Sequence, residues 1–272
     1  ISVMKNLKSV SWLKKHLKDS DLILLDASQV SNISGAVSNL VGTNIPGSQY
    51  FDIKNVFSDG SSRFPNTVPS ANQFQQEVQK LGINSNSTVV VYDNIGIYTS
   101  PRVWWLFRYF GHSKVYVLDG GLPEWVANDN ETSAVLKTTE PGDFKSVINL
   151  KLIKTIEDIQ KNIDSGDFDV VDARNEARFN STTSEPRKGL RSGNIPNSSN
   201  IPYSEVLHLG KIKSTVELTA IFSKTIETKK SVSFSCGSGV TACILLLAHQ
   251  EITDDIASIY DGSWTEWGTS ID

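Results

Sequence analysis

Cysteine is scarce in this chain: its 272 residues include only Cys236 and Cys243. Two cysteines so close in sequence cannot supply a disulfide framework, and such usage is typical of a protein in a reducing compartment. Neither cysteine lies in a CxxC or CxxH pattern, the ligand spacing typical of zinc sites. The sequence therefore predicts no disulfide scaffold, no metal site and no cofactor.

A strong excess of charge and long apolar runs are also missing. The 26 Lys and Arg residues face 30 Asp and Glu residues, for a net charge of −4. This balance favours neither nucleic acid nor a membrane surface as a partner. No apolar run approaches the length of a membrane span, and Ile1–Leu7 lacks the apolar core of a signal peptide. The single methionine is Met4, so Ile1–Val3 is expected to be either a processed end or a cloning remnant.

What the chain has instead is one set of landmarks that occurs twice. In each half an acidic residue ends an apolar strand, an Asn-Ile-Pro step follows, a second strand leads through a loop into a helix, and a third strand ends in Asp-Gly. The landmarks recur 142 to 150 residues later, in the pairs Asp26 and Asp172, Pro46 and Pro196, Asp93 and Cys236, and Asp119 and Asp261. Unrelated segments that merely share common turns would not keep such similar offsets, so the sequence predicts an internal duplication.

Each half alternates short, continuous apolar strands with amphipathic helices. This pattern predicts a mostly parallel sheet flanked by helices on both faces, in the α/β class. Helix starts are visible at Ser70, a candidate N-cap, and at Thr155, which forms a candidate capping box with Asp158. We therefore expect two similar domains, at residues 1–130 and 145–272, joined by a polar linker at 131–144.

The most informative segment is the loop Cys236-Gly237-Ser238-Gly239-Val240-Thr241, which joins an apolar strand to an apolar helix. Small residues allow the loop amides to face one point, and a helix N-terminus adds partial positive charge, so both stabilise a thiolate. The alternative is a buried structural cysteine, which would not require the flanking glycines. The matching position in the first half is Asp93, for which capping its own turn is the favoured role. Cys243 is expected to pack in the core.

Several segments together resemble the rhodanese superfamily, and more narrowly its tandem-domain 3-mercaptopyruvate sulfurtransferases. The segments are Tyr50-Phe51-Asp52-Ile53, Ser100-Pro101-Arg102-Val103-Trp104-Trp105, Leu118-Asp119-Gly120-Gly121-Leu122, Glu185-Pro186-Arg187, Cys236-Gly237-Ser238-Gly239-Val240-Thr241-Ala242-Cys243 and Tyr260-Asp261-Gly262-Ser263-Trp264. The resemblance covers nearly the whole chain. It implies two rhodanese-like domains, of which the first is non-catalytic and the second catalytic.

The resemblance also implies the chemistry. Cys236 would take sulfur from a small-molecule donor, 3-mercaptopyruvate, and become a persulfide, with pyruvate as the product. Thioredoxin, a low-molecular-weight thiol or cyanide would then accept the outer sulfur. A cytoplasmic or mitochondrial location follows from the resemblance and from the reducing compartment that the cysteine usage indicates.

Substrate-binding residues are implied in the same way. Arg178 and Arg187 match the two arginines of the family that hold the carboxylate of the keto acid, and the planar fork of arginine suits two carboxylate oxygens. A surface ion pair, for instance of Arg178 with Glu176 or Glu185, is the alternative. The loop residues Gly237, Gly239, Val240 and Thr241 would cradle the persulfide and substrate, while Arg174 and Arg191 are expected to be structural or at the rim.

The loop serine of the family is part of a Ser-His-Asp relay, and here Ser238 and Asp52 match the serine and the acid. The position of the histidine, however, is Asn66 in Pro65-Asn66-Thr67. An asparagine cannot shuttle a proton, so Ser238 is expected to act at least as a hydrogen-bond donor. None of the four histidines is expected to be catalytic: His16 and His112 resemble solvated residues, and His249 near a helix end suits a cation.

Three other functions remain open. Thiosulfate sulfurtransferase would use the same machinery, although relatives of that kind more often have basic residues in the cysteine loop. A phosphatase of a related fold would need an arginine six positions after Cys236, where the chain has Ala242. A non-catalytic rhodanese-like binding module would not need the cysteine. The sequence favours a sulfurtransferase that uses 3-mercaptopyruvate.

Overall fold

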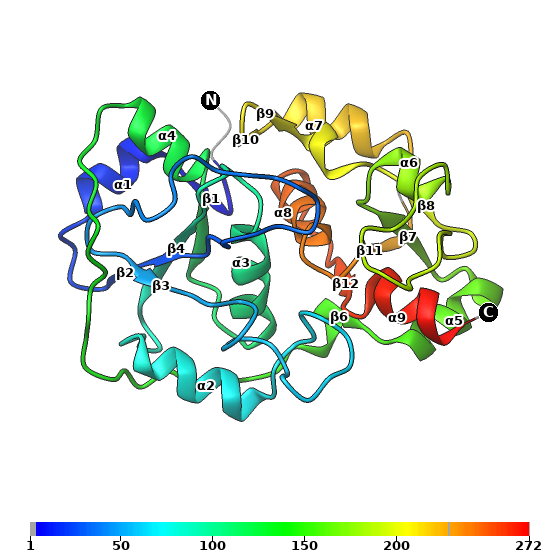
Figure 1. The fold of residues 1–272 in the computed structure, drawn as a ribbon, viewed down its shortest axis with the longest axis horizontal. Helices are drawn as coiled ribbons and strands as arrows, with labels where there is room; N and C mark the ends of the chain where they lie inside the picture. The colour runs from blue at the N-terminus through cyan, green and yellow to red at the C-terminus, as the bar shows by residue number, and fades with distance from the viewer. Residues whose placement is uncertain (1–3, 228, 272) are drawn as a thin grey trace.

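The fold of the chain was determined as a computed structural model, which describes residues 4–227 and 229–271. The prediction about Ile1–Val3 lies outside the described residues. The described chain forms two lobes, each built on one five-stranded sheet, with helices α3 and α8 side by side where the lobes meet (Figure 1).

The first lobe is built on a parallel sheet in the order β1-β5-β4-β2-β3. Its strands are β1 (Leu7–Lys8), β2 (Leu22–Asp26), β3 (Gln49–Tyr50), β4 (Thr88–Tyr92) and β5 (Val115–Leu118). Its helices are α1 (Val10–His16), α2 (Ala71–Lys80), α3 (Ser100–Tyr109) and α4 (Gly121–Ala127). Residues of α1 and α4 pack together in one apolar cluster and those of α2 and α3 in another, so helices cover both faces of the sheet.

The second lobe repeats this arrangement with the strand order β6-β12-β11-β7-β8, also parallel. Its strands are β6 (Ile153–Lys154), β7 (Phe168–Asp172), β8 (Ser199–Asn200), β11 (Ser231–Ser235) and β12 (Ser258–Tyr260). Its helices are α5 (Ile156–Ser165), α6 (Glu176–Phe179), α7 (Thr215–Phe222), α8 (Ala242–Ile252) and α9 (Ser263–Ser270). Two 3₁₀ helices, η1 (Leu150–Leu152) and η2 (Tyr203–Val206), and a small hairpin, β9 (Leu207–His208) and β10 (Lys211–Ile212), complete the described elements.

Local sequence signals explain where two of the helices begin. The hydroxyl of Ser70 accepts from the amide of Gln73 at the start of α2. Thr155 and Asp158 form the expected capping box at the start of α5. These side chains satisfy amides that a helix start leaves without intrahelical partners, so both starts were readable from sequence.

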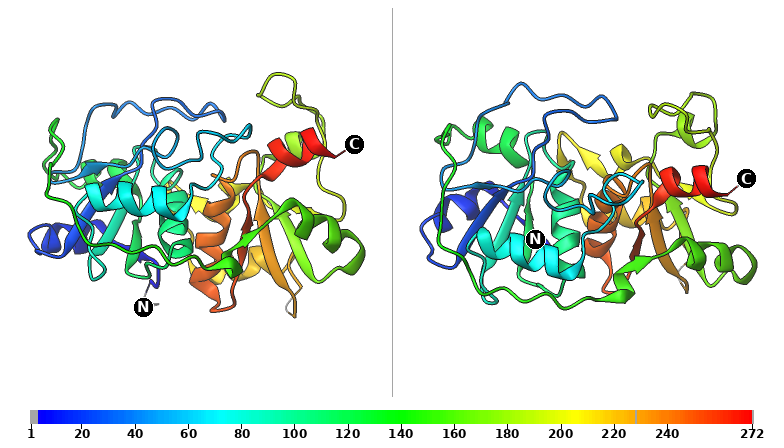
Figure 2. Two further views of the ribbon diagram at one scale, coloured as in Figure 1. Left: turned by 90° about the horizontal axis from the view of Figure 1, so that it is seen from below. Right: turned by 60° about the horizontal axis from the view of Figure 1, so that its bottom comes forward.

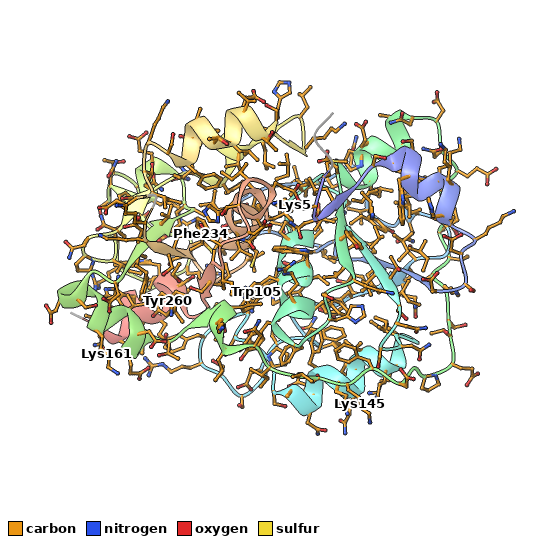
Figure 3. All side chains as sticks on the ribbon, turned by 180° about the vertical axis from the view of Figure 1, so that it is seen from behind. Lys5, Trp105, Lys145, Lys161, Phe234 and Tyr260 are labelled. Carbon is orange, nitrogen blue, oxygen red and sulfur yellow. The ribbon has the colours of Figure 1, made fainter. Side chains whose placement is uncertain are left out.

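The two lobes share one apolar core. A single cluster of buried side chains includes Trp104 and Trp105 of α3, Leu245 of α8 and Phe234 of β11, so it passes from one sheet to the other. Figure 3 shows Trp105 and Phe234 in the dense layer of side chains around α3 and α8. Burying apolar area between the lobes holds them together, which fixes their relative position at any site that both lobes build.

The loops that follow the strands gather on one side of the molecule. Figure 2 shows segments 27–44 and 55–68 of the first lobe and 180–195 of the second rising on this side. Ligands of parallel α/β sheets bind beyond the carboxyl ends of the strands, so this side is where a site is expected. Within the described residues, no helix combines the length and the apolar character needed to cross a membrane.

Candidate active site

A pocket of about 740 Å³ lies between the two lobes. The first lobe contributes lining residues such as Ser34, Asn66 and Tyr98, and the second lobe contributes Arg178, Arg187 and the cysteine loop. The pocket therefore forms only where the shared core brings the two halves together.

Cys236 is one of the residues that line this pocket; it lies directly after β11, and it is buried. Its own amide donates to Ser263 Oγ at 3.1 Å and its carbonyl accepts from Trp264 N–H at 3.0 Å. The Gly239 amide donates to Cys236 Sγ at 3.1 Å, from a backbone with φ +83° that favours glycine. The sulfur thus sits at the N-terminus of α8 with a main-chain donor already on it, as the sequence predicted.

The first lobe shows what this kind of loop can hold. Asp93 stands at the position equivalent to Cys236, and its carboxylate accepts from four amides, those of Ile95, Gly96, Tyr98 and Ser100, at 2.9 to 3.1 Å. The same backbone pattern after Cys236 would offer amides to a negatively charged sulfur. The loop is therefore an anion cradle, which a carboxylate fills in the first lobe and a sulfur atom enters in the second.

Arg178 and Arg187 both approach the cysteine loop. A Cβ atom on Gly237 would lie 3.0 Å from Arg178 Nη2 and 3.3 Å from Arg187 Nη1, so the glycine leaves room for both guanidinium groups. These two nitrogens are buried and have no hydrogen-bond partner among the described residues. Two buried cationic donors without partners, next to a nucleophile, form a strong site for an anion.

The neighbouring acidic residue Glu185 orients this pair. Its buried carboxylate accepts from Arg178 Nε at 2.6 Å and from Arg174 Nη1 at 2.5 Å. The ion pair that was the alternative for Arg178 exists, but it is buried and leaves Nη2 free for the pocket. Burial lowers the pKa of Arg187.

Arg174 and Arg191 have the structural positions that were expected. Arg174 is buried against Asp172, with Nη2 2.7 Å from Oδ2, and its guanidinium lies over the ring of Trp264. Arg191 lies 4.8 Å from the centroid of the same ring and donates to the carbonyls of Gly268 and Ile271. Both arginines hold α9 against the rest of the second lobe.

Of the other loop residues predicted to bind substrate or act in catalysis, all but Gly239 line the pocket. Ser238, Val240 and Thr241 line the pocket together with Gly237. Gly239 is turned the other way: a Cβ atom on it would lie 2.9 Å from the carbonyl oxygen of Asp261. Gly239 therefore acts through its backbone, which aims its amide at the sulfur.

The predicted serine relay is assembled only in part. Asn66 Nδ2 donates to Ser238 Oγ at 2.9 Å, across the boundary between the lobes. Asp52 does not join them: its carboxylate accepts from the amide and side chain of Asn55 at 2.9 to 3.2 Å, and the residue is not among those that line the pocket. Because Asn66 supplies a donor, the Ser238 hydroxyl accepts from it and keeps its own hydrogen for a group in the pocket.

Sequence reasoning missed two buried residues that support the site. Arg102 of α3, which lies in one of the segments that resemble the family, reaches Gly239, Asp261 and Asn66. Asp261, at the end of β12, pairs with Arg102 at 2.8 Å. The available signal was an arginine in the first turn of a largely apolar helix, since such a side chain is rarely buried without a partner.

Cys243 packs in the core as predicted, and two of the predictions about histidines were wrong. Burial raises the pKa of Cys243, whose Sγ lies 3.3 Å from the Gly239 carbonyl. His112 is buried, not solvated, and its Nε2 lies 2.8 Å from the Ser87 carbonyl oxygen. His249 is buried between Phe222 and Phe234, and burial lowers its pKa to about 4, so it is neutral and not a helix-end cation. In the described part of the chain, no three His, Cys, Asp or Glu side chains cluster as metal ligands would.

The sequence of this chain is similar to those of known proteins that contain rhodanese-like domains. The Rhodanese-like domain family matches residues 9–128 and 155–270. A 3-mercaptopyruvate sulfurtransferase from Rattus norvegicus is 39% identical, over 97% of this chain and 92% of that protein. The Thiosulfate/3-mercaptopyruvate sulfurtransferase 1, mitochondrial, of Arabidopsis thaliana is 37% identical, over 100% of this chain and 78% of that protein.

A solved structure agrees with the sequence matches. The crystal structure of SseA from Escherichia coli, described as showing the rhodanese fold and catalytic mechanism of 3-mercaptopyruvate sulfotransferases, superposes with a TM-score of 0.84 at 31% identity, over 95% of this chain and 98% of that one. The predicted resemblance and the predicted α/β fold with two parallel sheets are thus confirmed. The chain belongs to the rhodanese family and carries two copies of its domain.

Proposed function

We propose that this chain transfers sulfur from 3-mercaptopyruvate through a persulfide on Cys236 to a thiol acceptor, and releases pyruvate. One observation carries the proposal. Arg178 Nη2 and Arg187 Nη1 are buried, have no partner among the described residues and converge on Gly237, next to a buried cysteine at a helix N-terminus. This arrangement suits a small anion that brings an electrophilic sulfur to the thiolate. The relatives named 3-mercaptopyruvate sulfurtransferase agree with the predicted enzyme class.

In this proposal each pocket residue has a distinct role. The arginine nitrogens hold the carboxylate of the substrate, which puts its sulfur near Cys236 Sγ. The thiolate attacks that sulfur, the new S–S bond forms, and the C–S electron pair moves onto the substrate carbon as the enolate of pyruvate. The proton of the substrate thiol ends on that carbon, so thiolate and mercaptopyruvate give persulfide and pyruvate. Ser238 donates its hydroxyl hydrogen to the developing enolate oxygen, as an oxyanion donor does.

The second half-reaction returns the cysteine to its thiolate form. An acceptor thiol attacks the outer sulfur, a new persulfide forms on the acceptor, and the electron pair of the broken S–S bond returns to Cys236. The volume of the pocket, about 740 Å³, is large enough for a thiol larger than the keto acid. We propose thioredoxin, a low-molecular-weight thiol or cyanide as the acceptor, in the cytoplasm or in mitochondria.

The two halves of the chain have different roles in this proposal. We propose a non-catalytic domain at 1–130, a linker at 131–144 and a catalytic domain at 145–272. Asp93 fills the loop of the first half with its own carboxylate, and a carboxylate in that position cannot carry sulfur. The first half nevertheless lines the pocket through residues such as Asn66 and Tyr98.

Thiosulfate is the second candidate donor, because the Arabidopsis relative is named for both donors. Thiosulfate ends in a tetrahedral sulfonate with three oxygens, whereas two guanidinium nitrogens match the two oxygens of a carboxylate more directly. The loop Cys236–Thr241 also lacks the basic side chains that a sulfonate would favour. We therefore expect 3-mercaptopyruvate to be the better donor.

The test is a donor comparison on the purified chain, with Cys236→Ser as the inactive variant. Cys243→Ser is the matched control, since it removes the second thiol outside the pocket. We expect a higher kcat/KM for 3-mercaptopyruvate than for thiosulfate, and a mass gain of one sulfur atom, labile to cyanide, on Cys236 in the parent and in Cys243→Ser. A higher kcat/KM for thiosulfate would replace the proposed donor. No sulfur on Cys236 with either donor would leave a non-catalytic binding module.

A further inference from the structure

The side chain of Arg102 crosses from the first lobe to the cysteine loop of the second. It comes from α3, and its side chain is completely buried. Its Nη1 donates to Asp261 Oδ1 at 2.8 Å and to the Gly239 carbonyl at 3.3 Å, and its Nη2 donates to the Asn66 carbonyl at 2.5 Å. The guanidinium also lies over the ring of Trp105, 4.7 Å from the centroid. One side chain thus joins α3 to three other segments of the chain.

Two of these contacts hold residues that donate hydrogen bonds to Cys236 or Ser238. Gly239 offers its amide to Cys236 Sγ, and its carbonyl is fixed by Arg102. Asn66 offers its side-chain amide to Ser238 from a left-handed backbone, φ +59°, and its carbonyl is also fixed by Arg102. The donor to the nucleophile and the donor to the loop serine therefore depend on the same guanidinium.

Asp261 completes the arrangement. Its Oδ1 accepts from Arg102, and its Oδ2 accepts from the amide of Val68 at 2.8 Å, two residues beyond Asn66. The carboxylate of the second lobe thus holds both the arginine and the first-lobe segment that follows the turn at Asn66. Burial works against a charge on Arg102, but Asp261, Cys243 and Cys236 together raise its pKa above the ordinary value, so it stays cationic.

We propose that Arg102 is a positioning residue for sulfur transfer, through which the first domain sets the geometry and the charge around Cys236 in the second. The part of this inference that concerns kcat rests on the proposed function. It explains why a half with no reactive cysteine forms part of the site. A duplicated domain that kept only a packing role would not need to place a buried cation on the loop of its partner domain.

The test separates positioning from simple stabilisation. Arg102→Met alone would leave Asp261 buried without its partner and could lose stability, so it is combined with Asp261→Asn, which removes both charges. Arg102→Lys keeps the charge but not the fork of donors. Arg108→Met is the matched control: Arg108 lies on the same helix, over the ring of Trp104, and contacts Asn6. Circular dichroism and thermal midpoints monitor the fold of every variant.

The first readout is the alkylation rate of Cys236 by iodoacetamide against pH, with the modified residue identified by mass spectrometry. The charged or titratable groups that face Cys236 or its loop are Arg102, Arg178, Arg187, Tyr98 and Cys243. Loss of the Arg102 charge alone, in a folded Arg102→Met variant, should move the midpoint of the profile to higher pH by about one unit, the low end of the effect of an adjacent opposite charge. The double variant also loses the negative charge of Asp261, so its midpoint should move in the same direction by less. Arg108→Met should leave the profile unchanged.

The second readout is turnover. We expect kcat to fall about tenfold or more in the double variant and less in Arg102→Lys, with a smaller change in KM, because the arginines that bind the substrate are untouched. A folded double variant with the parental alkylation profile and the parental kcat would overturn the inference and leave the proposed function intact. Alkylation needs no sulfur donor, so a parent chain without sulfurtransferase activity would refute the proposed function and not this inference.

Discussion

Arg187 provides the sharpest test of the substrate pocket. Its Nη1 is buried without a partner among the described residues and lies beside Gly237, so a bound carboxylate would be its natural acceptor. A hydrogen bond to a charged group contributes about 1.5 to 3 kcal/mol, which corresponds to about a 10- to 150-fold change in kcat/KM. Arg187→Met should lose this amount. Arg187→Lys keeps the charge but not the planar fork, and should lose about tenfold.

The change should appear mainly in KM. The contact exists in the bound substrate as well as in the transition state, so its removal weakens both alike. The measurement is steady-state kinetics with 3-mercaptopyruvate, with Lys188→Met as the control that removes an exposed positive charge from the next position. An unchanged KM in both Arg187 variants, or an equal rise in Lys188→Met, would remove Arg187 from the substrate site.

Two further predictions concern Asn66 and His249. Asn66→Ala removes the hydrogen-bond donor to Ser238 and should lower kcat about fivefold, the effect of about 1 kcal/mol. Asn66→His should make kcat depend on a group that titrates near pH 6.5, a dependence that the parent pH–rate profile should lack. A parent profile that already shows this dependence would contradict the reasoning. Burial lowers the pKa of His249 to about 4, so the unfolded chain binds a proton first and the free energy of unfolding should fall by about 3 kcal/mol as the pH drops from about 6.5 to 4. Chemical denaturation of His249→Phe should show a smaller fall in the free energy of unfolding over the same pH range. An equal fall in that variant would refute the role of a buried, neutral His249.

The pattern of residues along the chain was enough to predict the fold and to identify Cys236 as the candidate nucleophile. A parallel sheet that is covered on both faces needs apolar side chains at successive positions of its strands, so continuous apolar strands bounded by turn residues predict such a sheet. The repeated landmarks predict that it occurs twice. The Cys-Gly-Ser-Gly-Val-Thr loop identifies Cys236 because its amides, its glycines and the following helix lie within a few residues of the sulfur. Interactions between residues so close in the chain can be predicted from the sequence.

The tertiary structure alone decided which distant side chains meet this loop. Asn66 reaches Ser238 and Arg102 reaches Gly239 only because the shared core packs α3 against α8, across more than a hundred residues of sequence. Asp52, by contrast, matches the family motif but contacts Asn55, since the direction of a side chain depends on its local turn and not on its place in a motif. Packing between the two lobes, which no local pattern encodes, determined the charge and the hydrogen bonds that the first lobe adds around the cysteine loop.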